Sequence, residues 1–159
     1  MVKLRDLVNA VAATLGAIPE VVAALAPIDP IQAYIDLNPT SNSVALALYQ
    51  MQPGQLLVVW RGTRLTKDNM SRWSHLVDIC IRSLPGESDM DLVDTIMEGV
   101  PVPGDGQVWL NCPVMDGVYS TEVSDIERRT DEEGVDYFAI LTETAETGDW
   151  RAASSRRVI

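Results

Sequence analysis

The chain has few of the residues that most catalytic and metal sites require. Its 159 residues include two cysteines and one histidine, and no Cys-x-x-Cys pair occurs. A serine or cysteine nucleophile needs a neighbouring base, usually a histidine, and structural zinc needs several Cys or His ligands at short spacings. We therefore expect no catalytic residues, no metal site and no cofactor.

Phosphate-binding and membrane-spanning patterns are also missing. There is no GxxxxGK[ST] or GxGxxG motif, and the glycines of PGDGQ at 103–107 indicate a loop. The longest apolar runs, such as VALALY and LLVVW, are far shorter than a membrane span. Asp6 and Asn9 interrupt the apolar region that a signal peptide requires. We therefore interpret the first residues as mature structure and the protein as cytoplasmic when it is made.

The cysteines and the histidine have structural interpretations. Cys80 and Cys112 lie in apolar stretches, so we expect buried free thiols rather than a disulfide. His75 lies in the middle of an alternating apolar pattern. A hydrogen-bonded structural histidine is therefore expected there, rather than a catalytic base.

Charge is distributed unevenly along the chain, whose formal net charge is −11. Residues 1–83 carry seven basic and six acidic side chains, whereas residues 84–159 carry five basic and seventeen acidic ones. An acidic surface repels a phosphate backbone, which argues against sequence-specific binding of nucleic acid. The simplest interpretation of the acids is a solvated face.

Hydrophobic spacing predicts two helices near the N-terminus. Apolar residues from Leu4 to Leu15 follow a helical period, and Gly16 stands where a helix ends. Pro19 suits the first turn of a second, short helix. The residues expected on its apolar side are Ile18, Val21, Val22 and Leu25.

Three strands are predicted next: a short one within 31–43 that runs into an Asn-Pro loop, and two longer ones at 56–65 and 72–84. The stretch 44–55 fits either a buried strand or a short helix. The strand at 72–84 alternates between two faces. One face carries Trp73, His75, Val77, Ile79 and Ile81, and the other carries Ser74, Leu76, Asp78, Cys80 and Arg82.

A third helix is predicted at 88–99, capped by Ser88, with an apolar stripe from Leu92 to Met97. A Pro/Gly loop at 100–107 and at least two further strands follow, of which 135–143 is the clearest. This order predicts an α+β fold, in which a mainly antiparallel β-sheet packs against an N-terminal helix and one central helix. We expect one domain over 1–147 and a flexible C-terminal tail over 148–159.

The stretch RRTDEEGVDYFAILTE, residues 128–143, places four acids around Gly134: Asp131, Glu132, Glu133 and Asp136. A calcium loop would need acids alternating through its middle, but apolar strand residues stand there. Asp131 can instead accept hydrogen bonds from the backbone ahead of it, and Gly134 can take the positive φ that closes a hairpin. The stretch is therefore predicted to be a hairpin, with Phe138 and Ile140 in the core.

The layout as a whole resembles a known family. An amphipathic helix, a strand leading to YIDLNP, the strand RWSHLVDICIRS ending in LPGE, the helix DLVDTIMEG and the late hairpin RTDEEGVDYFAILTE follow one another. This arrangement is similar to tail terminator proteins of long-tailed bacteriophages and to related head–tail joining, or neck, proteins. The resemblance covers residues 1–147.

The resemblance implies a non-enzymatic structural virion protein. Its subunits would form a homo-oligomeric ring, expected to be a hexamer, that caps the tail tube, ends tube polymerisation and joins the tail to the neck. The implied partners are the tail tube protein and a neck or head-completion protein. DNA would pass through the lumen without specific binding, and no membrane is involved. The protein would reside in the virion tail or neck, and in the host cytoplasm before assembly.

An acidic lumen would keep a sliding polyanion mobile. Candidate lumen-facing acids are Asp89, Asp91, Asp94 and Glu98 on the central helix. Candidate subunit-interface bases are Arg128 and Arg129, for which pairing within the chain is the alternative. Two other functions stay open: a small acidic inhibitor that binds a basic partner, and an enzyme that uses carboxylates and a divalent ion.

Overall fold

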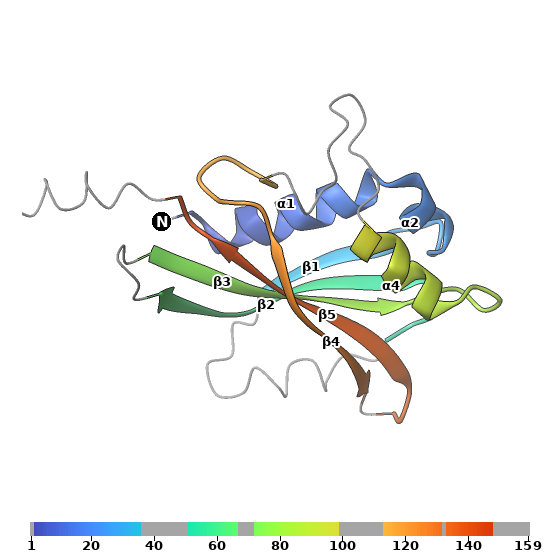
Figure 1. Cartoon of the computed structure of the whole chain (residues 1–159). Coiled ribbons are helices and arrows are strands. Elements are labelled where there is room, and N and C mark those ends of the chain that lie inside the picture. The colour runs from blue at the N-terminus through green and yellow to red at the C-terminus, as the bar shows by residue number, and fades with distance from the viewer. Residues whose placement is uncertain (1, 36–50, 67–71, 99–112, 132, 148–159) are drawn as a thin grey trace, which may run out of the picture.

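Five strands form one mixed sheet in the computed structural model, which describes residues 2–35, 51–66, 72–98, 113–131 and 133–147 (Figure 1). The strand order is β1-β2-β3-β5-β4. Strands β1 and β2 are parallel, and the other neighbouring pairs are antiparallel. The strands are β1 (Ile31–Ile35), β2 (Gln55–Thr66), β3 (Arg72–Arg82), β4 (Glu122–Thr130) and β5 (Asp136–Ala145).

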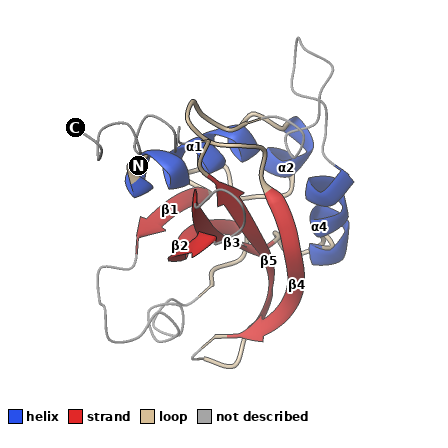
Figure 2. Cartoon of the chain, turned by 60° about the vertical axis from the view of Figure 1, so that its left-hand side comes forward, coloured by secondary structure: helices blue, strands red, loops and turns tan. Residues whose placement is uncertain are grey.

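Three helices accompany the sheet in the described part of the chain: α1 (Leu4–Gly16), α2 (Pro19–Ala23) and α4 (Asp89–Glu98). They lie on one side of the strands (Figure 2). The predicted α+β class, with a mainly antiparallel sheet, an N-terminal helix and one central helix, is therefore confirmed. None of these helices combines the length and the apolar character that crossing a membrane demands.

The main core lies between the helices and one face of the sheet. Leu7, Val11 and Leu15 of α1 are fully buried there, together with Val77 and Ile79 of β3. The predicted alternation of β3 is confirmed, because Cys80, between Ile79 and Ile81, belongs to a cluster on the opposite side of the sheet. We call the side of the sheet against which the helices pack the helix face, and the opposite side the outer face.

One detail of the predicted packing was wrong. Val22 was expected on the buried side of the second helix, but it is 40% exposed while Val21 is fully buried. Successive helical residues point about 100° apart, and α2 has only five residues. A helix this short can turn only one of the two valines toward the core.

The outer face carries a second buried cluster, which includes Leu57, Cys80 and Tyr137. Cys80 is a fully buried free thiol, as predicted, and its burial raises its pKa to about 12. The thiol therefore stays protonated at neutral pH and behaves as a small apolar side chain. Cys112, the predicted loop at 100–107 and the predicted tail at 148–159 lie outside the described residues.

Candidate functional site

A chain of ion pairs crosses the outer face of the sheet. The Asp78 carboxylate on β3, which is fully buried, accepts from Arg61 Nε on β2 at 3.0 Å and from Arg129 Nη1 on β4 at 3.1 Å. Arg129 Nε also contacts Glu127 at 3.1 Å. Two arginines from separate strands therefore satisfy one buried acid, and the cluster connects β2, β3 and β4 across β5.

This geometry separates the two arginines proposed for a subunit interface. Arg129 is engaged within its own chain. Burial opposes its charge, but the Asp78 carboxylate outweighs this effect and raises the pKa of Arg129 above its ordinary value. Arg128 is exposed and lies on the opposite face, where its guanidinium stands 5.4 Å from the centre of the Phe138 ring. Of the pair, Arg128 is the one whose charge faces solvent.

The four acids proposed to line a lumen also divide into two groups. Asp89 is half-buried, and its Oδ1 accepts from the backbone N–H of Ser83 at 2.7 Å and from its hydroxyl at 2.5 Å. Asp89 therefore fixes the turn that precedes α4. The other three are exposed on the side of α4 away from its buried residues Leu92, Val93 and Ile96; they are Asp91, Asp94 and Glu98.

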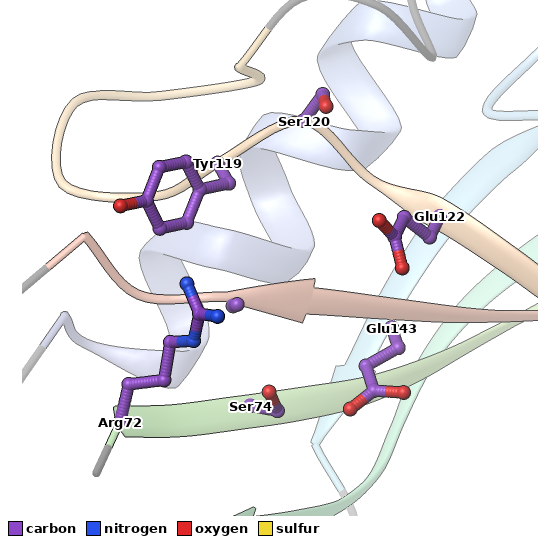
Figure 3. A pocket seen from close by; sticks show the side chains of 7 residues that line it. Arg72, Ser74, Tyr119, Ser120, Glu122 and Glu143 are labelled. Carbon is purple, nitrogen blue, oxygen red and sulfur yellow. The ribbon is translucent and has the colours of Figure 1, made fainter. Parts of the chain in front are cut away.

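A pocket of about 390 Å³ opens on the outer face, near the end of β5 (Figure 3). At one end, the guanidinium of Arg72 lies 5.4 Å from the centre of the Tyr119 ring. At the other end, Glu122 and Glu143 stand opposite each other on β4 and β5. Arg64 binds both carboxylate oxygens of Glu143, at 3.1 and 2.6 Å. Ser74, Ser120 and Ala145 complete the lining.

The pocket has groups of both charges but no recognisable catalytic arrangement. Within the ranges that the structure describes, no three His, Cys, Asp or Glu side chains are placed to hold a metal ion. The sequence analysis missed the pocket, because its walls come from three separate segments, 72–74, 119–122 and 143–145, that meet only when β3, β4 and β5 pair. No local pattern marks such a site.

His75 is fully buried in a relay of hydrogen bonds, as a structural histidine was predicted to be. Its Nδ1 lies 2.8 Å from the Thr63 hydroxyl, and its Nε2 lies 3.0 Å from Glu146 Oε2. Trp60 Nε1 donates to the same hydroxyl at 3.0 Å, and the backbone N–H of Val2 donates to Glu146 Oε1 at 2.6 Å. The relay ties the N-terminal segment to β2, β3 and the end of β5.

The hydroxyl–imidazole–carboxylate order of this relay is also found in nucleophilic enzymes. Neither Thr63 nor His75 lines the pocket of Figure 3, however, and the imidazole has no exposed surface. A relay centred on a fully buried imidazole satisfies buried polar groups, which would otherwise destabilise the fold. We therefore interpret it as structural.

The acid-rich hairpin that the sequence analysis singled out is a turn built around Asp131. Its Oδ1 accepts from the N–H groups of Glu133 and Val135, both at 2.9 Å, and its Oδ2 accepts from Met51 N–H at 3.1 Å. Gly134 has φ +81°, as predicted for the turn. Asp131 is 6% exposed, and its carboxylate accepts hydrogen bonds from three backbone N–H groups.

These bonds predict an acid-sensitive turn. The Val135 N–H, with further help from those of Met51 and Glu133 and from the charge of Arg82, lowers the pKa of Asp131 below its ordinary value of 3.8. A lowered pKa stabilises the fold at pH values above 3.8, and this stabilisation is lost as the pH falls through the lowered value. Asp131→Asn is therefore expected to lower the melting temperature at pH 7 by about 5 °C.

The difference between wild type and Asp131→Asn should shrink as the pH is lowered below 3.8 in a series of thermal melts. Asp136→Asn is the matched control. Asp136 is an exposed acid of the same hairpin, and among the described residues its one hydrogen-bond donor is the Thr130 hydroxyl, at 2.7 Å. Its variant should melt close to wild type at every pH. A constant difference for Asp131→Asn across the series would contradict the assignment.

Comparison with known proteins identifies no family for this chain. No protein-family model and no curated protein matches the sequence. What the structure defines is a class: an α+β domain whose helices pack on one face of a five-stranded mixed sheet. The features that bear on its function are the element order, the exposed charges and the edges of the sheet.

Proposed function

We propose that the chain is a non-enzymatic structural protein of a phage virion, which forms a ring that caps the tail tube and joins it to the neck. The observation that carries this proposal is the element order. Helix α1, strand β1, the long strand β3, helix α4 and the β4–β5 hairpin follow one another as in the arrangement that resembles tail terminators. No catalytic residue or cofactor is part of the proposal.

The exposed side of α4 supports a passage for DNA. Asp91, Asp94 and Glu98 share that side, and the buried side of the helix anchors it to the core. Repeated around a ring, three acids per subunit would form a negative wall that repels phosphates and leaves DNA free to slide. Asp89 is left out of this wall, because Ser83 occupies its carboxylate.

The proposed partners follow from the same assignment. One end of the ring would contact the tail tube protein and stop its polymerisation, and the other would receive a neck or head-completion protein. The ring would be a homo-oligomer, with a hexamer expected, in the virion tail or neck. Before assembly the subunit would be in the host cytoplasm.

Negative-stain microscopy of the purified protein, alone and mixed with tail tubes, tests the proposal. Closed rings with a central hole, of a mass that light scattering assigns to several subunits, are expected, with α4 on the inner wall in a three-dimensional reconstruction. Rings with α4 on the outer wall would overturn the proposal that the α4 acids line the lumen, but not the proposal that the protein forms a ring. A monomer that also ignores the tubes would overturn the proposed function, and a one-to-one complex with a basic protein would favour an inhibitor.

A further inference from the structure

The two edge strands of the sheet, β1 and β4, run in opposite directions, so copies placed side by side in the same orientation can pair them as antiparallel strands. The strand order ends in β1 on one side and in β4 on the other. Following the pairs across the sheet, β1, β2 and β5 run one way, whereas β3 and β4 run the other way. If a second copy is placed beside the first with its sheet continuing in the same plane, β4 of one copy meets β1 of the next as an antiparallel pair.

The hydrogen-bonding pattern of the hairpin shows which backbone groups of β4 point outward. Asp131 N–H donates to Val135 O at 2.9 Å, and bonded and non-bonded pairs alternate in an antiparallel ladder. The groups of Ile126, Arg128 and Thr130 therefore point away from β5. Asp125 Oδ1 already accepts from Ile126 N–H at 2.8 Å. Among the described residues, nothing else bonds to this edge.

The edge of β1 has the same periodicity. Leu56 N–H donates to Pro30 O at 2.8 Å, which sets the alternation of the parallel pair. Gln32 and Tyr34 then direct their backbone groups toward β2. The groups that point away from β2 belong to Ile31, Ala33 and Ile35.

We propose that β4 of one copy pairs with β1 of a neighbouring copy, with Arg128 opposite Ala33 of the neighbour. The same register places Ile126 opposite Ile35 and Thr130 opposite Ile31 of the neighbour. Arg128 is paired with Phe138, which packs on the helix face, and Ala33 packs on that face too. The two sheets therefore join with their helices on the same side.

Charge favours this pairing over a pair of identical strands. Three registers could join two antiparallel β4 strands through their outward backbone groups. Placing Arg128 opposite Ile126 brings two Glu127 side chains together, and placing it opposite Arg128 brings two Arg128 side chains together. Placing Arg128 opposite Thr130 brings two Arg129 side chains together. Like charges directly opposite each other destabilise a strand pair. Strand β1 has the sequence IQAYI and carries no charge, so the β4–β1 pair contains no such conflict.

The inference rests on the proposed function and supplies its geometry. A contact between two different edges is heterologous, and heterologous contacts either close into rings or continue as filaments. The contact would also cover the exposed backbone of β4, which is otherwise a template for uncontrolled pairing. Ile126, which is 41% exposed in one copy, would gain an apolar neighbour.

Paired cysteines test the register. Residues opposite each other in a hydrogen-bonded antiparallel pair have Cα atoms about 5.5 Å apart, within the range of a disulfide. The double variant Arg128→Cys/Ala33→Cys is expected to give, under mild oxidation, a ladder of covalent oligomers on a denaturing gel. The two single variants are the controls, and both should stay monomeric on the gel. All variants also carry Cys112→Ser, so that this thiol cannot react, and Cys80 does not interfere because it is fully buried.

The outcomes separate the interface from the function. A dimer from Arg128→Cys alone would show β4–β4 pairing, and one from Ala33→Cys alone would show β1–β1 pairing; either would overturn the inference. Rings in the microscope without a ladder from the double variant would overturn the interface and leave the proposed function standing. A protein that is monomeric by light scattering and gives no ladder would overturn the interface. If it also fails to bind tail tubes in the microscope, the proposed function is overturned as well.

Discussion

Replacing Asp78 with alanine is expected to lower the free energy of unfolding by about 3 kcal/mol. The substitution leaves Arg61 and Arg129 facing each other across a site from which the balancing carboxylate has gone. Removing one partner of a buried ion pair typically costs about 3–5 kcal/mol. The lower end applies here, because the two arginine side chains are 35% and 21% exposed and water can solvate part of their charge.

Arg64→Ala is the matched control for this prediction. Arg64 also binds a carboxylate on the outer face, but its side chain is 62% exposed. Exposed pairs contribute about 0–1 kcal/mol, so its loss should be small. Urea unfolding followed by tryptophan fluorescence measures both variants. Equal losses for Asp78→Ala and Arg64→Ala would contradict the view that the Asp78 cluster holds the outer face together.

Gly54→Ala is the second substitution expected to have a large effect. Gly54 has φ +79°, and a Cβ built there would lie 2.7 Å from the backbone N of Ala26 and 2.8 Å from Leu84 Cδ2. The first contact cannot relax freely, because Ala26 N–H donates to Gly54 O at 2.9 Å. Left-handed strain and overpacking together should cost about 3 kcal/mol.

Gly134→Ala separates the two causes. Gly134 has nearly the same φ, +81°, but nothing lies within 4 Å of the position its Cβ would take. Its substitution therefore carries only the conformational term, about 1 kcal/mol. The same urea series gives both values. If the two alanine variants lose equal stability, the close approach of Gly54 to Ala26 contributes nothing and the packing argument fails.

Local patterns predicted the parts of this fold that local physics determines. The alternation of β3 placed Val77 and Ile79 on one face and Cys80 on the other, and these prove to be the helix face and the outer face. The turn at Asp131 and Gly134 was also predictable, because its hydrogen bonds span only a few residues. Periodicity, capping and turn chemistry depend on residues that are close together in the sequence, so these features can be predicted from a short stretch of it.

Features that depend on strand order were not predictable in this way. Nothing near Asp78 in the sequence indicates Arg129, which lies 51 residues further on and becomes a neighbour only after β4 pairs with β5. The parallel pairing of β1 with β2 was not predicted either. The sequence analysis treated Arg128 and Arg129 as equivalent, although adjacent residues of a strand point to opposite faces.

The hydrogen bond between Val2 and Glu146 has a consequence for how the chain folds. It joins residues 144 positions apart, so it closes a loop that includes every described helix and strand. Contacts of such high sequence separation form slowly, since the entropy of the whole loop must be lost first. During synthesis, α1 emerges long before Glu146 does. Val2 is therefore among the last residues to reach its native bond, and His75 stays incompletely satisfied until Glu146 arrives.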